Sequence, residues 1–276
     1  MEILYTLLNI DPNYIIIGLF VVFFTFEQIL NTPFKFDKRP KHFFHNFLFQ
    51  ILFVIANYFF AIFVVFSVEW LNDHNIGLLY LFDIPFWPKL IIGVLLYDVT
   101  TYWIHRATHK IPLLWRFHRV HHSDTSVDSS TFFRFHPIEL ILVFGIGNIL
   151  TVLLFGTDLL SMALYYLILN IFVFFEHSNL YYPYWLDKTF GWIITTPNLH
   201  KVHHEQTQFY TDSNFADIFI LWDRLFGTYK YLPVENINYG LKEFDEDKKQ
   251  TFQYLILSPF INIKRITSEK AVNSDQ

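Results

Sequence analysis

The sequence contains no cysteine among its 276 residues. This absence excludes disulfides, thiolate metal sites, a cysteine nucleophile and any iron–sulfur cluster held by the chain itself. A metal site in this protein must therefore use nitrogen and oxygen ligands. The length suits one large domain and leaves little room for two.

Charged residues are also scarce, at 16% of the chain, whereas an ordinary soluble domain carries roughly 25%. Hydrophobic residues make up 53% and aromatic residues 21%, which is typical of a membrane protein. The net charge is −5, and the basic residues are scattered among aromatics and histidines instead of forming a stripe. We therefore expect an integral membrane protein without a nucleic-acid partner.

Five apolar stretches are candidate membrane helices. They are residues 14–30, 47–68, 90–104, 140–156 and 159–175. No Lys or Arg precedes the first stretch, which predicts a retained helix and not a signal peptide. Only Thr157 and Asp158 separate the last two, which predicts a tight helical hairpin. The expected fold class is an all-α, polytopic membrane bundle of about four to five spans.

The distribution of positive charge predicts the orientation of these spans. Four basic residues lie between the first two spans: Lys35, Lys38, Arg39 and Lys41. The stretch "NDHNIGLLYLFDIPFW" between the second and third spans has none, so the first loop is expected to be cytoplasmic. Counting onward, the third and fifth spans also end on the cytoplasmic face.

The expected organisation is a single membrane domain covering residues 1–276. Its N-terminal spans occupy residues 14–85, a catalytic region occupies 86–232, and a cytoplasmic tail occupies 233–276. The catalytic region is expected to place a helical cap, with most of the histidines, on the cytoplasmic face.

Histidines gather near the ends of the later spans. The spacing H-x-x-H-H occurs twice, at His118, His121 and His122 and again at His200, His203 and His204. On a helix these positions fall within an arc of roughly 100°, and His105 and His109, four apart, also share a face. Each cluster is therefore a set of converging nitrogen donors. The isolated His42, His45 and His74 are predicted to be hydrogen-bonded polar groups without a metal role.

So many imidazoles fit two metals, because one catalytic metal takes about three or four protein ligands and keeps a position open. The sequence has no H-E-x-x-H motif, so a zinc protease would lack its base. It also lacks paired Glu-x-x-His helices, which disfavours a carboxylate-bridged di-iron bundle. His177 follows the fifth span at the depth of the other clusters, and it is predicted to be a further ligand.

Two polar residues inside the spans are candidates for catalytic roles. Asp98 shares a helical face with His105, and a carboxylate within a membrane helix is a functional candidate. It is expected either to orient His105 or a neighbouring ligand, or to make a local hydrogen bond to Thr101 or Tyr102. Asn170 lies seven residues before His177 and so on nearly the same face.

His136 precedes Pro137 at the start of the fourth span and has three possible roles. It is a tenth metal ligand, a hydrogen-bond partner of a ligand, or a cap at the membrane interface.

Five motifs, in order along the chain, resemble those of the fatty acid hydroxylase and sterol desaturase superfamily of integral-membrane di-iron oxygenases. They are "YDVTTYWIHRATHK", "LWRFHRVHHSD", "STFFRFHPIE", "FFEHSN" and "TTPNLHKVHHEQ", followed by "TDSNFADIFILWDRLFGTY". The resemblance covers about residues 97–229. It implies two iron ions held by nine histidines: His105, His109, His118, His121, His122, His177, His200, His203 and His204. Some relatives have a second histidine in the box around His177, where this chain has Tyr181.

The resemblance also implies O2-dependent hydroxylation or desaturation of a lipid, such as a sterol-like, fatty acyl or ether lipid. No nucleotide-binding glycine motif and no cysteine is present, so electrons are expected from an external ferredoxin-like or cytochrome-type donor. Candidate docking residues, unless they only follow the positive-inside rule, are Arg106, Lys110, Arg116 and Arg119. Two alternatives stay open at this point: a zinc-dependent membrane hydrolase, and a metal transport or storage protein.

Overall fold

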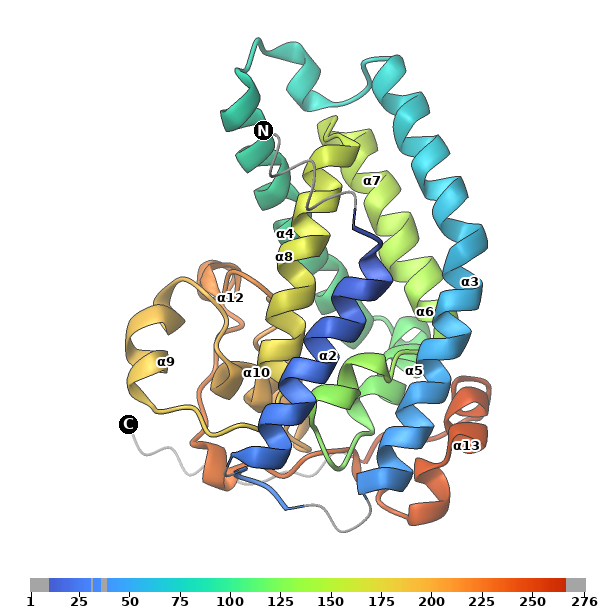
Figure 1. The fold of residues 1–276 in the computed structure, drawn as a ribbon, viewed down its shortest axis with the longest axis vertical. Coiled ribbons are helices and arrows are strands. Elements are labelled where there is room, and N and C mark those ends of the chain that lie inside the picture. Colours follow the sequence, from blue (N-terminus) through green and yellow to red (C-terminus); the bar gives the residue numbers. More distant parts are fainter. Residues whose placement is uncertain (1–9, 31, 36–38, 267–276) are drawn as a thin grey trace.

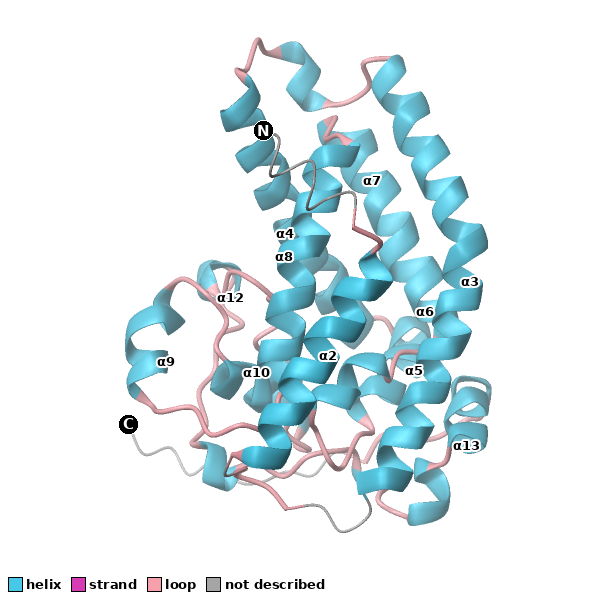
Figure 2. Cartoon of the chain, in the orientation of Figure 1, coloured by secondary structure: helices cyan, strands magenta, loops and turns pink. Residues whose placement is uncertain are grey.

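The computed structural model describes residues 10–30, 32–35 and 39–266. These residues form helices and loops without a strand, apart from one isolated β-bridge between Glu205 and Tyr239 (Figure 2). The predicted all-α class is therefore confirmed. Long helices run side by side as a bundle, and shorter helices gather at one end of it as a cap (Figure 1).

The bundle consists of five helices: α2 (Pro12–Ile29), α3 (Arg39–Asp73), α4 (Phe86–Lys110), α7 (Ile146–Phe155) and α8 (Leu159–His177). Three stretches are long and apolar enough to cross a bilayer: Pro12–Ile29, Pro40–Leu81 and Leu159–His177. In the first two, only 11% of the most apolar window is buried within the protein. Their apolar side chains therefore point outward, as expected for helices that face lipid chains.

The predicted third and fourth spans are less regular than the other three. α4 has 25 residues, but Lys89, Asp98 and Arg106 interrupt its apolar sequence. α7 has only 10 residues, about 15 Å of helix. It continues from α6 (Pro137–Glu139) through a π-helical segment, Leu140–Gly145. The count of four to five spans stays a prediction.

α7 and α8 form the predicted hairpin. Gly156 ends α7 with φ of +71°, a left-handed conformation that favours glycine, and the Asp158 carboxylate accepts a hydrogen bond of 2.8 Å from the Ser161 amide to begin α8. The loop after α3 packs directly on this turn, because a Cβ added to Gly77 would lie 2.0 Å from the Gly156 nitrogen. The end of the bundle opposite the cap is thereby closed by backbone contact.

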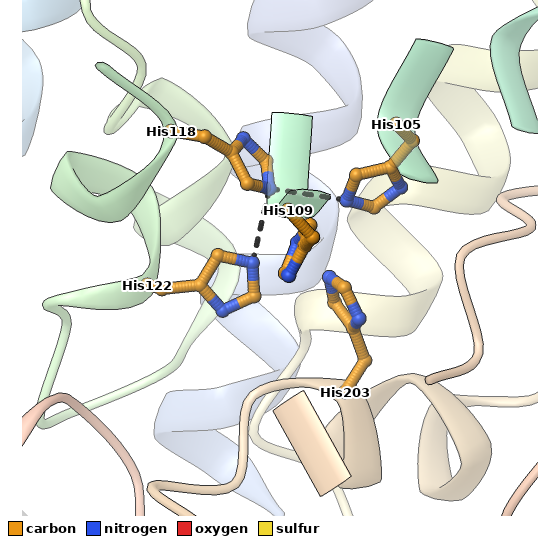
Figure 3. Close-up of side chains that lie close together, drawn as sticks. All are labelled: His105, His109, His118, His122 and His203. Atoms are coloured by element: carbon orange, nitrogen blue, oxygen red, sulfur yellow. Dashed lines mark hydrogen bonds between the residues drawn. The ribbon is translucent and has the colours of Figure 1, made fainter. Parts of the chain in front are cut away.

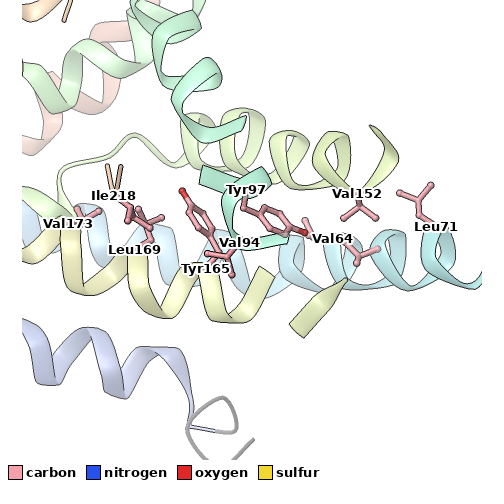
Figure 4. Packing of buried hydrophobic residues seen from close by; sticks show 10 residues of the cluster. Val64, Leu71, Val94, Tyr97, Val152, Tyr165, Leu169, Val173 and Ile218 are labelled. Atoms are coloured by element: carbon pink, nitrogen blue, oxygen red, sulfur yellow. The ribbon is translucent and has the colours of Figure 1, made fainter. Parts of the chain in front are cut away.

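One hydrophobic core joins the bundle to the cap (Figure 4). Its buried residues come from α3, α4, α7 and α8 and from the cap: Val64, Val68, Leu71, Val94, Tyr97, Val152, Tyr165, Leu169, Val173 and Ile218. Tyr97 of α4 stacks on Tyr165 of α8 with 5.7 Å between ring centroids. Ile218 is the cap residue in this core, so the cap and the bundle share buried apolar surface.

The cap contains short helices: α5 (Pro112–His122), α9 (Trp185–Thr189), α10 (Pro197–His203), α11 (Gln208–Thr211), α12 (Leu221–Leu225) and α13 (Phe252–Leu257). Short 3-10 segments lie among them, at Ser129–Phe133, Phe190–Trp192, Val234–Asn236, Lys242–Phe244, Asp247–Gln250 and Ser258–Phe260. A further 3-10 segment, Leu78–Leu81, lies between α3 and α4 at the opposite end of the bundle (Figure 1). Residues 233–266, which the sequence suggested were a tail, are therefore folded. Residues 267–276 and Lys38 lie outside the described residues.

An apolar contact and a set of hydrogen bonds from Arg134 hold this C-terminal segment in place. Its buried Leu241, Phe244 and Leu255 pack with Phe49 of α3 and Trp115 of α5. These apolar residues are spaced among charged ones, which is why their burial was not evident from composition.

Arg134 adds hydrogen bonds to this apolar contact. Its fully buried guanidinium donates to the Asn46 side chain at 3.2 Å and to the Gln250 side chain at 2.5 Å, and its Nε donates to the Val120 carbonyl at 3.1 Å. One side chain thus connects α3, α5 and the C-terminal segment.

Glu27 makes the corresponding connection for α2. Its buried carboxylate accepts hydrogen bonds from the Ser129 amide at 2.9 Å, the Ser129 hydroxyl at 3.1 Å and the Asn179 amide at 2.8 Å. Asn179 lies two residues after His177, so this carboxylate also supports the end of α8.

We predict that Glu27→Leu destabilises the protein by about 2–4 kcal/mol, because buried amide donors lose their acceptor. Thermal unfolding of detergent-solubilised protein measures the change. Gln28→Ala, at the exposed neighbouring position, is the matched control and is expected to leave Tm unchanged. Equal Tm values for the two variants would contradict this role of Glu27.

Candidate metal centre

The nine histidines predicted as ligands converge into two groups. The five-histidine group contains His105, His109, His118, His122 and His203, and the four-histidine group contains His121, His177, His200 and His204. Within each group, one ring nitrogen from every member lies within 4.8 Å of all the others. Figure 3 shows the rings of the five-histidine group pointing toward a common centre. Eight of the nine are buried and His105 is partly buried.

The H-x-x-H-H box on α5 contributes to both groups. His118 and His122, four residues apart, face the five-histidine group, while His121 faces the four-histidine group. On a helix with about 100° between successive residues, position +4 lies about 40° to one side of position 0, whereas position +3 lies about 60° to the other side. The spacing therefore supplies a pair of ligands to one group and a single ligand to the other.

The box on α10 divides in the opposite sense. His200 and His204 join the four-histidine group, and His203 joins the five-histidine group. Because α5 and α10 each reach both groups, the groups are neighbours: the His122 and His204 rings, from different groups, are 4.7 Å apart. The expectation that each box presents one common face is thus refined, since the face is shared between two centres.

Local sequence places the other ligands beside these boxes. His105 and His109 lie in the last turns of α4, which ends at Lys110 because Pro112 disfavours helix at the residue before it. Pro112 then begins α5, and the sharp turn brings the two helix ends together. His177 is the last residue of α8.

The spacing of the imidazole nitrogens is that of ligands around a metal ion. Nε2 of His118 lies 3.1 Å from Nε2 of His105 and 3.0 Å from Nε2 of His122. In the other group, Nε2 of His177 lies 3.1 Å from that of His204 and 3.2 Å from that of His200. At a metal–nitrogen distance of about 2.1 Å, neighbouring ligands are about 3.0 Å apart in an octahedron and about 3.4 Å apart in a tetrahedron.

Backbone carbonyls fix the orientation of three rings. Nδ1 of His105 donates to the Phe215 carbonyl at 2.8 Å, Nδ1 of His177 to the Val173 carbonyl at 2.8 Å, and Nδ1 of His203 to the Ser213 carbonyl at 2.7 Å. These bonds place the proton on Nδ1 and leave the lone pair of Nε2 facing the group.

Three carboxylates that sequence reasoning missed contact other rings. Glu139 lies 2.5 Å from Nδ1 of His118, Asp212 lies 3.4 Å from Nδ1 of His109, and Glu176 lies 3.5 Å from Nδ1 of His200. A carboxylate behind a histidine ligand raises its basicity and holds its ring. Glu139 was detectable in principle, because it stands in the quoted motif "STFFRFHPIE".

Burial keeps these imidazoles neutral. It lowers the pKa of His121, His122, His200, His203 and His204 well below the ordinary value of 6.5, and neighbouring rings lower it further. Burial alone lowers the pKa of His118 to about 3. Nε2 of His109 and of His203 are buried without a hydrogen-bond partner, which a coordinated ion would remedy. The donor set therefore fits a metal.

Asp98 does not orient His105. Its buried carboxylate accepts a hydrogen bond of 2.7 Å from the Trp222 indole and one of 3.3 Å from the Phe219 amide, while the Phe215 carbonyl occupies Nδ1 of His105. The hydrogen bonds of Asp98 therefore go neither to a histidine ligand nor to the hydroxyl of Thr101 or Tyr102, the partners expected from the sequence. Asp98 instead ties α4 to the segment that carries Phe215.

Asn170 and His136 lie outside both groups. The Asn170 amide donates to the Tyr166 carbonyl at 2.8 Å, within its own helix. Nδ1 of His136 accepts from the Ile138 amide at 3.2 Å, and its Nε2 lies 3.2 Å from the Ile256 carbonyl. Of the three roles considered for His136, these contacts correspond to a helix cap.

The isolated histidines are hydrogen-bonded as predicted. His42 contacts the Asp124 carboxylate at 2.7 Å, and His74 contacts the Trp70 carbonyl at 2.7 Å. Nδ1 of His45 accepts from the Phe252 amide at 3.2 Å.

Residues 90–228, a stretch that includes all nine histidines, match the family model described as fatty acid hydroxylase. The chain belongs to the fatty acid hydroxylase family. This membership confirms the resemblance drawn from the motifs. No solved structure matches the chain.

Curated relatives within this family carry names of lipid-modifying enzymes. The chain is 28% identical over 173 residues to an alkylglycerol monooxygenase of Homo sapiens, covering 58% of this chain and 35% of the relative. It is 29% identical over 159 residues to an ornithine lipid hydroxylase of Rhizobium tropici, covering 54% and 46%. A very-long-chain aldehyde decarbonylase of Oryza sativa is 32% identical over 152 residues, covering 53% and 56%. The chain thus spans about a third of the length of the alkylglycerol monooxygenase.

We predict that His203→Ala and His121→Ala each lower the bound metal, the first by weakening the five-histidine group and the second by weakening the four-histidine group. Elemental analysis of purified protein measures the metal per chain. His136→Ala is the control and is expected to retain the full metal content, because His136 lies outside both groups. Full metal content in His203→Ala or His121→Ala would refute the assignment.

We also predict that the metal-free protein loses stability below about pH 6.5. Because the pKa of the buried histidines is lowered from 6.5, the unfolded chain binds more protons than the folded one below that pH. The free energy of unfolding then falls by up to about 1.4 kcal/mol per pH unit for each such histidine. Thermal unfolding of metal-free protein between pH 8 and pH 5 tests this, and a pH-independent Tm would contradict it.

Proposed function

We propose that this protein is an O2-dependent oxidoreductase that uses two iron ions to oxidise a C–H bond of a membrane lipid. The observation that carries the proposal is the convergence of nine histidines into two adjacent groups at one end of an apolar helical bundle. Family membership and the names of the relatives support the same chemistry.

Iron fits this donor set better than zinc does. Structural zinc is almost always tetrahedral, with four ligands, whereas one group here offers five imidazoles. Three of the four nitrogen separations, 3.0, 3.1 and 3.1 Å, also lie closer to an octahedral edge than to a tetrahedral one, and the fourth, 3.2 Å, lies midway. These two observations count against the zinc-dependent hydrolase.

The arrangement also argues against metal transport. A transport path requires ligands along the membrane-spanning helices, but the described histidine groups lie together at one end of the bundle. Buried ligands with fixed tautomers suit a permanently held ion better than a passing one.

We assign the first iron to the five-histidine group and the second to the four-histidine group. When bound, the pair would supply the capacity to activate O2 with electrons from outside the chain. The protein holds neutral nitrogen donors in fixed orientations through the Phe215, Val173 and Ser213 carbonyls and through Glu139.

Aromatic side chains exclude water from the same region. Phe135 stacks on the His121 ring at 4.1 Å, and Phe215 lies 5.0 Å from the His109 ring. Shielding of this kind protects a reactive centre from side reactions with solvent.

A lipid would reach the site laterally, because His105 and His177 lie at the ends of two helices of the bundle. The relatives are named for an alkylglycerol, an ornithine lipid and a very-long-chain aldehyde, which favours a long-chain substrate. Two of those names denote a monooxygenase or a hydroxylase, so we favour oxygen insertion over desaturation. We further infer that the groups face the cytoplasm, where a ferredoxin-like or cytochrome-type donor is available.

We predict that cells expressing the protein accumulate a lipid that is heavier by about 16 mass units, as one inserted oxygen atom requires. Comparative lipid mass spectrometry under 16O2 and 18O2 detects it, and the label should appear in the product. Cells expressing His121→Ala are expected to lack the species. A product without label, or one present in both strains, would exclude the proposed reaction.

A further inference from the structure

Basic side chains gather around Asp212 where α4 ends. Lys110, with 53% of its side chain exposed, lies 2.9 Å from the Asp212 carboxylate. Arg265 lies 3.5 Å from the same carboxylate. The half-buried Lys230 donates from its ammonium to the Phe209 carbonyl, three residues before Asp212. Its amide donates at 2.8 Å to the side chain of Asn214, two residues after Asp212, so this third cation belongs to the same cluster. We call Lys110, Lys230 and Arg265 the basic surface.

This basic surface is one side chain away from the five-histidine group. Asp212, which binds two of the cations, also lies 3.4 Å from Nδ1 of His109. The Arg265 guanidinium lies 4.1 Å above the Trp115 ring, whose centroid is 5.0 Å from that of His109 and 5.6 Å from that of His122. Asp212 and Trp115 thus each lie between the basic surface and the five-histidine group.

The four-histidine group has a different environment. The carboxylate beside His200 is Glu176, which is fully buried. The two groups therefore differ in their access to a charged surface.

Only one of the four arginine and lysine residues expected to dock a donor belongs to the basic surface. Arg119 is buried and donates to the Ser258 carbonyl at 2.5 Å, so it is structural and the expectation for it was wrong. Arg116 donates to the Ile261 carbonyl at 3.1 Å and Arg106 to the Tyr102 hydroxyl at 3.3 Å. Lys110 remains, joined by Lys230 and Arg265.

We propose that the basic surface is the docking site of an acidic electron-transfer protein, and that electrons enter through the five-histidine group. The inference rests on the proposed function, which requires an external donor. A cluster of cations attracts an acidic partner and raises its association rate, and this attraction weakens with salt. With iron bound by the histidines, each reduced carrier would give up one electron, which one ferric ion would accept.

Binding is tested with full-length protein in nanodiscs and two acidic carriers, a plant-type ferredoxin and a soluble cytochrome domain. The double variant Lys110→Gln/Lys230→Gln is expected to weaken carrier binding at low ionic strength at least tenfold. Lys188→Gln is the matched control, because Lys188 is an exposed lysine on α9, outside the basic surface. Equal affinities for the double variant and the control would overturn the proposal, as would failure of both carriers to bind wild-type protein at low salt.

Electron entry is tested by stopped-flow reduction of the iron-loaded protein under anaerobic conditions. For each variant, the rate of iron reduction by the carrier is divided by the rate of reduction by dithionite. This ratio is expected to fall at least tenfold in the double variant and to equal the wild-type ratio in Lys188→Gln. A constant ratio in both variants would refute the docking site. Absence of iron binding, or of lipid oxidation driven by dithionite, would instead refute the proposed function, while the binding measurement would still report on the basic surface.

Discussion

Eight buried imidazoles and one partly buried one meet at one end of the bundle, and burying their ring nitrogens is costly unless those nitrogens find partners. The rest of the structure depends on this requirement. Five outer nitrogens have partners: those of His105, His177 and His203 contact backbone carbonyls, and those of His118 and His109 contact Glu139 and Asp212. The outer nitrogens of His121, His122, His200 and His204 are buried without a hydrogen-bond partner among the described residues. The inner nitrogens face one another at 3.0–3.2 Å, a separation at which neutral rings with their lone pairs inward gain only from a shared cation. The chain is folded around two positions for positive charge.

Meeting that requirement needs segments far apart in the sequence to be held rigidly together. Glu27 connects α2 to the end of α8, and Arg134 connects α3 and α5 to the C-terminal segment. Asp98 connects α4 to the segment that carries Phe215. Each is an ionisable side chain in a buried environment. Such a group destabilises the fold when it has no partner, and it selects one particular arrangement of helices when its partners are present. The same few polar residues that interrupt the apolar sequence therefore fix the geometry of the site.

Much of the fold and of the metal centre could be predicted from the sequence, and the rest depends on contacts between residues that are far apart along the chain. Helical periodicity and box spacing are local, so the apolar spans, the hairpin at Asp158 and the nine histidines were accessible. The partner of Asp98 was not, because Trp222 lies more than a hundred positions away along the chain and no local pattern links them. The same holds for the Phe215 carbonyl behind His105 and for the folded segment around Leu255, whose burial depends on α3 and α5.

The division of each H-x-x-H-H box has a consequence for how the two centres come together. A rotation or translation of α5 displaces His118 and His121 at the same time, and α10 behaves likewise with His200 and His203. The centres are consequently not independent modules. Occupation of one immobilises helices that also carry ligands of the other, which reduces the entropy lost at the second step. Metal loading should therefore be cooperative, with half-filled protein rare at equilibrium.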